Sequence, residues 1–143
     1  MHKILTLSLL LISSNVAANW KSFDNPNQFY SPLVTTGEQL SHVSLSLRPN
    51  GDLSLSISHS NYLLCSAPKD QFRSAMSVDG QAISTIQGCP KAGNSLKVVA
   101  SSAGVEFIVN RLLQNDYVNI DGVDVPSEGF AEALKNIQNN RPL

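Results

Sequence analysis

Residues 43–57 read VSLSLRPNGDLSLSI, two runs of alternating apolar and polar residues separated by Pro49, Asn50 and Gly51. Alternation with a period of two predicts half-buried β-strands. The connection suits a type I turn followed by a glycine in the left-handed region. If Arg48 pairs with Asp52, each apolar residue of one run faces an apolar residue of the other on one side of the sheet. The stretch therefore predicts an antiparallel hairpin with a fixed register.

The same register extends into residues 56–65, SISHSNYLLC, which hold the residue types of a nucleophilic active site. A strand divides them between its two faces, because successive side chains point to opposite sides. His59 pairs with Ser41 at the end of the apolar stripe, whereas His42 pairs with Ser58 on the other face. We expect His59 to be a partly buried, hydrogen-bonded side chain. Neither a catalytic residue nor a shared metal site is predicted from the two histidines.

The N-terminus, MHKILTLSLLLISSNVAANW, has the layout of a secretory signal peptide. Lys3 supplies a positive charge, residues 4–12 are mostly apolar, and residues 16–18 (VAA) form a small-residue cleavage site. The apolar run is shorter than the roughly 20 residues of a membrane-spanning helix. We therefore predict a signal peptide over residues 1–18 and no transmembrane segment.

Removal of 18 of the 143 residues leaves 125, the size of a single domain, spanning 19–143. Within it, residues 19–40 are expected to form an extended N-terminal arm. Without Lys3, nine bases stand against 11 acids, a formal charge of −2. A nucleic-acid-binding protein normally presents a basic face, so this class is not expected. The predicted location is the periplasm, with secretion or attachment to the outer membrane as alternatives.

The chain has two cysteines, Cys65 and Cys89. Export would deliver them to an oxidising compartment, where they would form a disulfide; an intermolecular bridge is the alternative. The intramolecular bridge would contribute roughly 3.5 kcal/mol by the chain-entropy estimate for a loop of this length. The spacing matches neither a Cys-x-x-Cys redox motif nor a zinc site. No metal or other cofactor is predicted.

Further hairpins and helices are predicted in the second half of the chain. Asp79-Gly80 separates two alternating runs and indicates a two-residue loop that pairs Val78 with Gln81. Residues 95–100 form a strand, and residues 105–113 have helical apolar spacing, although their β-branched residues leave a strand open. Residues 117–125 form one strand, or two that meet at Gly122. Ser127 is expected to cap a helix over 128–138.

These elements together predict an α+β fold. It is a single domain rich in antiparallel β-hairpins, a sandwich or a partly open barrel, closed by one or two helices and containing one disulfide.

The second half of the chain resembles the invasion-associated locus B family of exported bacterial proteins. The similarity rests on Val78-Asp79-Gly80, on Cys89 within IQGCP, on the helix-like stretch and following strand, and on VPSEGFAEAL over residues 125–134. That family typically carries a second cysteine just after the position of Cys89, where this chain has residues 91–94. The resemblance implies a small, β-rich envelope protein without known catalytic residues, so no site residue is transferred.

Five acids with no base among them lie in the C-terminal part of the chain, and they are the candidate binding residues: Asp116, Asp121, Asp124, Glu128 and Glu132. A solvated acidic face is one interpretation. The other is a docking surface for a cationic partner, because clustered like charge accelerates association and selects against wrong partners.

The resulting hypothesis is a periplasmic, non-enzymatic binding protein. Most concretely, it is an inhibitor or immunity protein that blocks a cationic peptidoglycan hydrolase or toxin. The alternative is an envelope or virulence-associated protein of the invasion-associated locus B type. A second alternative is a small glycosidase with a pair of catalytic carboxylates drawn from the acidic segment.

Overall fold

The computed structural model describes residues 19–141, so the predicted signal peptide lies outside the described residues. Nine strands and two helices form this part of the chain: β1 (Gln28–Tyr30), β2 (Val34–Thr36), β3 (Gln39–Leu47), β4 (Leu53–Ser60), β5 (Lys69–Val78), β6 (Gln81–Lys91), β7 (Asn94–Val99), α1 (Ser102–Gln114), β8 (Tyr117–Ile120), β9 (Val123–Pro126) and α2 (Phe130–Asn139). Neither helix in this range is long and apolar enough to cross a membrane.

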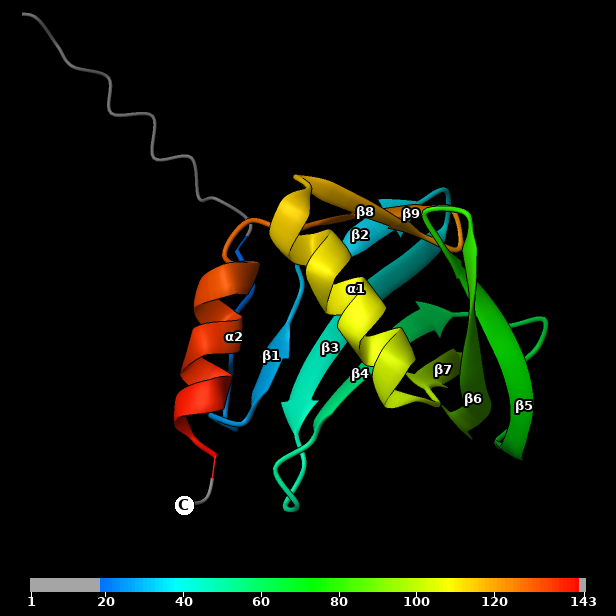
Figure 1. The fold of residues 1–143 in the computed structure, drawn as a ribbon. Coiled ribbons are helices and arrows are strands. Elements are labelled where there is room, and N and C mark those ends of the chain that lie inside the picture. The colour runs from blue at the N-terminus through cyan, green and yellow to red at the C-terminus, as the bar shows by residue number, and fades with distance from the viewer. Residues whose placement is uncertain (1–18, 142–143) are drawn as a thin grey trace, which may run out of the picture.

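All the strands belong to one antiparallel sheet, ordered β1-β3-β4-β7-β6-β5-β8-β9, with β2 also paired to β3. The sheet curls into a half-barrel, with α1 across its concave side and α2 beside β1 (Figure 1). The predicted α+β fold with hairpins, helices and one disulfide is therefore confirmed. Of the two predicted architectures, the structure is the partly open barrel.

The β3–β4 hairpin has the predicted register, with apolar residues opposite one another: Leu47 with Leu53, Leu45 with Leu55 and Val43 with Ile57. At its end, the Arg48 amide donates to the Asp52 carbonyl at 2.9 Å. Gly51 has a φ of +87°, the left-handed conformation that the turn requires. The hairpin therefore places a stripe of buried side chains on the concave face of the half-barrel.

Helix α1 packs into that concave face. Ser101 caps it by accepting a hydrogen bond from the Gly104 amide at 3.1 Å, and its buried residues include Val105, Ile108 and Leu112. Asn115 ends the helix. The helical interpretation of residues 105–113 is confirmed, and the strand alternative is wrong. The 3.6-residue spacing prevails over β-branching because all three apolar side chains reach the same core.

The hairpins β5–β6 and β8–β9 are joined by two similar turns, Asp79-Gly80 and Asp121-Gly122. The register Val78–Gln81 is the predicted one, and residues 117–125 form two strands rather than one. The Asp79 carboxylate accepts the Asn119 amide at 2.8 Å, and the Asp121 carboxylate accepts the Ser77 amide at 2.8 Å. The Asp79-Gly80 turn is therefore hydrogen-bonded to β8, and the Asp121-Gly122 turn is hydrogen-bonded to β5.

Each of these two carboxylates also pairs with a base. Arg111 on α1 donates to Asp79 at 2.8 Å, and Lys97 on β7 donates to Asp121 at 2.8 Å. Burial alone would raise the pKa of Asp79, but the Asn119 amide and the Arg111 guanidinium outweigh it and lower that pKa below its ordinary value. The two turns therefore link three parts of the fold, namely α1, the sheet and the β8–β9 hairpin.

Residues 19–40, expected as an extended arm, carry β1 and β2 and also complete the core. Trp20 is buried, and its indole Nε1 donates to the Pro126 carbonyl at 2.9 Å. Its ring meets that of Phe130 edge to face, with centroids 4.9 Å apart. The segment thereby connects one edge of the half-barrel with the start of α2.

Helix α2 begins at Phe130, two residues later than expected. Its N-cap is Gly129, with a φ of +80° and no side-chain hydrogen bond, so the prediction that Ser127 caps the helix is wrong. The Ser127 hydroxyl instead donates to the Asn115 carbonyl, and the Ser127 amide donates to the backbone carbonyl of Asp116. The Ser127 side chain is thus bonded to the end of α1, and it is the Gly129 carbonyl that accepts the first hydrogen bond of α2, from the Ala133 amide at 3.1 Å.

Candidate functional site

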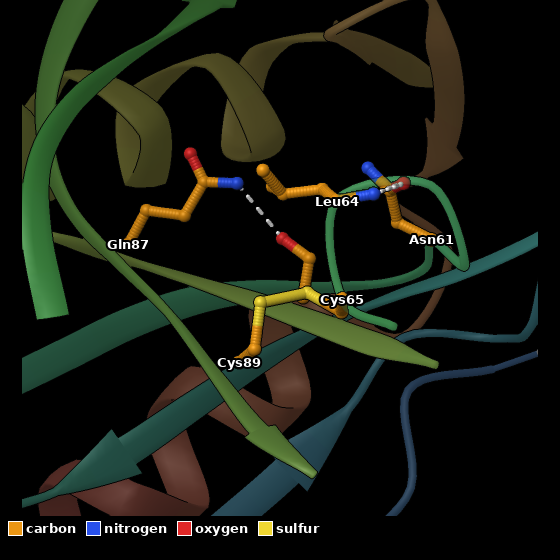
Figure 2. The surroundings of a disulfide bond; sticks show 6 residues. Asn61, Leu64, Cys65, Gln87 and Cys89 are labelled. Atoms are coloured by element: carbon orange, nitrogen blue, oxygen red, sulfur yellow. Dashed lines mark hydrogen bonds between the residues drawn. A yellow bond between two sulfur atoms is a disulfide. The ribbon is translucent and has the colours of Figure 1, made fainter. Parts of the chain in front are cut away.

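A disulfide holds the segment between β4 and β5. The predicted bridge between Cys65 and Cys89 is present, with a Cα–Cα distance of 5.6 Å and both residues buried. Asn61 closes the turn that leads into it: its carbonyl accepts the Cys65 amide at 2.9 Å, and its Oδ1 accepts the Leu64 amide at 3.0 Å (Figure 2). The Asn61 amide in turn donates to Gly93 in the β6–β7 turn at 2.9 Å. We call residues 61–65 the braced loop.

The braced loop exposes two large side chains. Tyr62 is 78% exposed and Leu63 99% exposed. The Tyr62 ring lies against Gly93, where a Cβ atom would come within 2.6 Å of the ring. Apolar side chains presented together by a rigid loop are typical of interaction surfaces. The sequence offered only a weak signal for this loop, three adjacent large residues between a strand and a cysteine.

A second feature is a polar region on the concave face of the sheet. The pairing of β3, β4 and β7 aligns Ser41, His59 and Ser95 in one row across the three strands. In the next row, Lys97 on β7 faces Gln87 on β6. Cross-strand partners share a face, so these polar residues continue the apolar stripe of the β3–β4 hairpin. Here the interior of the half-barrel changes from apolar to polar.

Specific hydrogen bonds hold this polar region. Ser41 Oγ and His59 Nδ1 are 2.6 Å apart, and Gln87 Nε2 donates to Ser95 Oγ at 3.0 Å. Lys97 Nζ donates both to the Asp121 carboxylate and to a backbone carbonyl of β5. We call the cavity of about 190 Å³ next to these groups the polar cavity; it is lined by Gln39, His59, Asn61, Gln87, Ser95, Lys97 and Asp121.

His59 is 6% exposed and hydrogen-bonded, as predicted. Burial lowers its pKa, nearby Asp121 opposes this shift, and Lys97 and His42 add to it. Ser41 is only 1% exposed and lies behind the imidazole, at Nδ1. A nucleophile must reach its substrate, so Ser41 orients His59 rather than attacking a ligand.

His42 lies on the convex face, opposite to His59, as predicted. Its ring packs against Tyr30 with centroids 5.5 Å apart, and Tyr30 packs against Phe23 at 5.7 Å. With Leu33 these rings line a mostly apolar groove of about 760 Å³ along the N-terminal segment. Within residues 19–141, no three His, Cys, Asp or Glu side chains converge as metal ligands.

The five candidate acids fall into two groups at opposite ends of the β8–β9 hairpin. Asp116, Glu128 and Glu132 line one hollow of about 470 Å³ beside the end of α1, and none of the residues that line it is basic. We call this hollow the acidic hollow. At the other end, Asp121 is paired with Lys97, and Asp124 accepts a hydrogen bond from the Asn119 side chain at 2.9 Å. The structure thus brings three of the five together.

Comparison of the chain with protein-family models, curated proteins and solved structures finds no match.

Proposed function

We propose that the protein is an exported, non-enzymatic binding protein, most concretely an inhibitor or immunity protein that blocks a cationic cell-wall hydrolase or toxin. The observation that carries this proposal is the braced loop. It combines two exposed anchors, Tyr62 and Leu63, with a disulfide and a set of backbone hydrogen bonds that hold the loop.

Rigidity of this kind favours tight binding. Association normally costs free energy to order loops and side chains at the interface, and a loop already held in shape avoids much of that cost. Large side chains that enter a partner's pocket contribute most of the binding free energy. A protruding loop with adjacent Tyr and Leu fits a concave surface such as the cleft of an enzyme.

The disulfide also supports export. A cysteine pair that is oxidised and buried is typical of proteins from oxidising compartments. This agrees with the signal peptide predicted from residues 1–18.

The acidic hollow supports a cationic partner. Asp116, Glu128 and Glu132 form a patch of one sign, and such patches raise the rate at which an oppositely charged protein finds its site. In this proposal the hollow attracts the partner over long range, whereas the braced loop makes the short-range contact.

The test begins with capture of the partner from an envelope extract, followed by binding kinetics with purified proteins. Leu63→Ala and Tyr62→Ala should each weaken binding at least about tenfold, mainly through faster dissociation. Leu33→Ala and Tyr117→Ala are the matched controls, because these side chains are also well exposed, at 61% and 63%, but lie outside the loop. If the loop variants bind as tightly as the controls, the braced loop is not part of the interface.

Charge reversal tests the attraction separately. Glu132→Lys should slow association and flatten its dependence on salt, since ionic strength screens the attraction between exposed charges. Asp70→Lys changes the net charge equally on an exposed strand residue and is the control. Equal association rates for the two variants at low salt would show that the acidic hollow does not guide the partner.

A further inference from the structure

The polar cavity adjoins the braced loop, with which it shares Asn61, but it includes neither of the exposed anchors Tyr62 and Leu63 and none of the acids of the acidic hollow. It opens on the concave face of the sheet, among side chains from β3, β4, β6, β7, the braced loop and the β8–β9 turn. A core packed from apolar residues alone would be more stable, because buried polar groups lower the stability unless each has a hydrogen-bond partner. Here the sequence instead places histidine, glutamine, serine and lysine on the face that is apolar one row away. Local departures of this kind are expected at functional or strained sites.

The side chains of the cavity are fixed before any ligand arrives. Ser41 holds His59, Ser95 holds Gln87, and Asp121 holds Lys97. His59, Gln87 and Ser95 are each at least nine-tenths buried. A ligand would therefore meet a set of polar atoms with defined positions, which is the property that gives a binding site its specificity.

The side chains of the polar cavity still offer both donors and acceptors of hydrogen bonds to a ligand. Gln87 donates its amide to Ser95, which leaves its Oε1 as an acceptor. Asn61 accepts the Leu64 amide at its Oδ1, which leaves its Nδ2 as a donor. Gln39 adds a third carboxamide, which can do both. Such a lining suits hydroxyl groups, each of which donates one hydrogen bond and accepts others.

The charges of the cavity cancel. Lys97 and Asp121 are 2.8 Å apart and neutralise each other, so neither an anion nor a cation finds an unpaired opposite charge. The volume of about 190 Å³ corresponds to roughly six water molecules at about 30 Å³ each, which is enough for one small ring with its substituents. We propose that the polar cavity binds a neutral pyranose sugar, through the carboxamides of Gln39, Asn61 and Gln87 and the imidazole of His59.

The test is an NMR titration of the oxidised, ¹⁵N-labelled protein with glucose and N-acetylglucosamine. Backbone shifts should be confined to the strands around the cavity. Chitotriose distinguishes the source of the sugar: similar or tighter affinity than the monosaccharide points to the end of a glycan chain, and weaker affinity points to a free sugar. Sodium sulfate and N-methylacetamide serve as probes for an anion and for a peptide group.

Two variants and one matched control link the shifts to the cavity. Gln39→Ala removes a half-exposed carboxamide and should leave the fold intact, and His59→Gln removes the imidazole; each should weaken sugar binding about tenfold or more. His42→Gln changes the same residue type on the convex face and should leave the affinity unchanged. The proposal is overturned if sulfate or N-methylacetamide binds more tightly than the sugars, if no sugar produces shifts, or if both cavity variants bind as well as His42→Gln. Because these readouts need no protein partner, they are independent of the inhibitor proposal.

Discussion

Asp79 and Asp121 each accept a hydrogen bond from the backbone of the strand that leads into the other's turn. Both residues have a positive φ, 48° and 51°, a conformation that aspartate and asparagine tolerate better than most residues. The amide of each aspartate also donates to the opposite strand, Asp79 to Asn119 and Asp121 to Ser77. The two hairpins are thus joined by two reciprocal sets of bonds although they share only one backbone pair in the sheet, Val78 with Ile120.

This arrangement predicts energetic coupling between the two turns. Asp79→Ala and Asp121→Ala should each lower the free energy of unfolding by about 1–3 kcal/mol, because each leaves a backbone amide without its acceptor. The double variant should lose less than the sum of the two, since one broken turn already loosens the other. Urea denaturation of the four proteins measures this coupling. Strictly additive losses would mean that the two turns act independently. Asp79→Asn and Asp121→Asn, which keep an acceptor oxygen, should cost less than the alanine variants.

Reduction of the Cys65–Cys89 disulfide should destabilise the protein substantially. The chain-entropy estimate for its loop is roughly 3.5 kcal/mol, a large share of the stability of a small domain. The Cys65→Ser/Cys89→Ser variant should therefore unfold at a clearly lower urea concentration than the oxidised protein. A reducing agent should shift the wild type to the same midpoint and leave the variant unchanged. Coincident midpoints for oxidised and reduced wild type would contradict this.

Stability should fall as the pH drops below about 6.5. Burial lowers the pKa of both His42 and His59 from the ordinary value of 6.5, against a smaller opposing effect of Asp121 on His59. Well above pH 6.5 both histidines are neutral in the folded and unfolded states. As the pH falls, the unfolded chain takes up protons first, so the stability present above 6.5 is lost as the pH passes through the folded-state pKa values.

Urea titrations between pH 8 and 5 check this dependence. In His59→Gln and in His42→Gln, the free energy of unfolding should decrease less steeply as the pH falls, because each variant removes one of the two histidines. Lys97 and His42 both lower the pKa of His59, so Lys97→Met should also reduce the part that comes from His59. If none of these variants changes the slope of stability against pH, the pH dependence arises from titratable groups other than the two histidines.

Trp20 should be essential for stability despite its place in the N-terminal segment. Trp20→Ala should cost about 3–5 kcal/mol, the usual range for removing a large buried aromatic side chain. Trp20→Phe should cost less, because it keeps the apolar ring next to Phe130 and loses mainly the hydrogen bond to Pro126. Trp20 is the single tryptophan, so its fluorescence should be blue-shifted and protected from iodide in the folded protein. Fluorescence that iodide quenches as readily as free tryptophan would contradict its burial.

The parts of the fold that could be predicted are those in which neighbouring residues decide the outcome. In the β3–β4 hairpin, the turn residues and the apolar alternation demand the same register, so two local signals agree. The Asp79-Gly80 turn was predictable for the same reason. Ser127 was misinterpreted because its hydroxyl bonds to Asn115, a contact that only the packing of α2 against the end of α1 creates.

The polar cavity could not be predicted because its members come from distant parts of the chain. Three of them, Gln39, Gln87 and Asp121, belong to different segments. They come together only because the sheet curls and the β8–β9 hairpin pairs with β5. The prediction that His59 continues the apolar stripe of the hairpin is confirmed, but its neighbours on β7 cannot be known from the hairpin alone. Similarly, the five acids are close in sequence, yet the β8–β9 hairpin carries Asp121 and Asp124 away from the other three.

The contacts of Trp20 have a consequence for the order of folding. Its hydrogen bond to Pro126 spans 106 residues, and Asn140 at the end of α2 bonds to Pro26 across 114. Bonds between such distant residues form slowly, because a long loop must close before they are made. During synthesis, Trp20 emerges long before its partner Phe130 and stays without it until almost the whole chain is available. The core next to α2 is therefore completed last, and the segment around Trp20 becomes stable in the same step as α2.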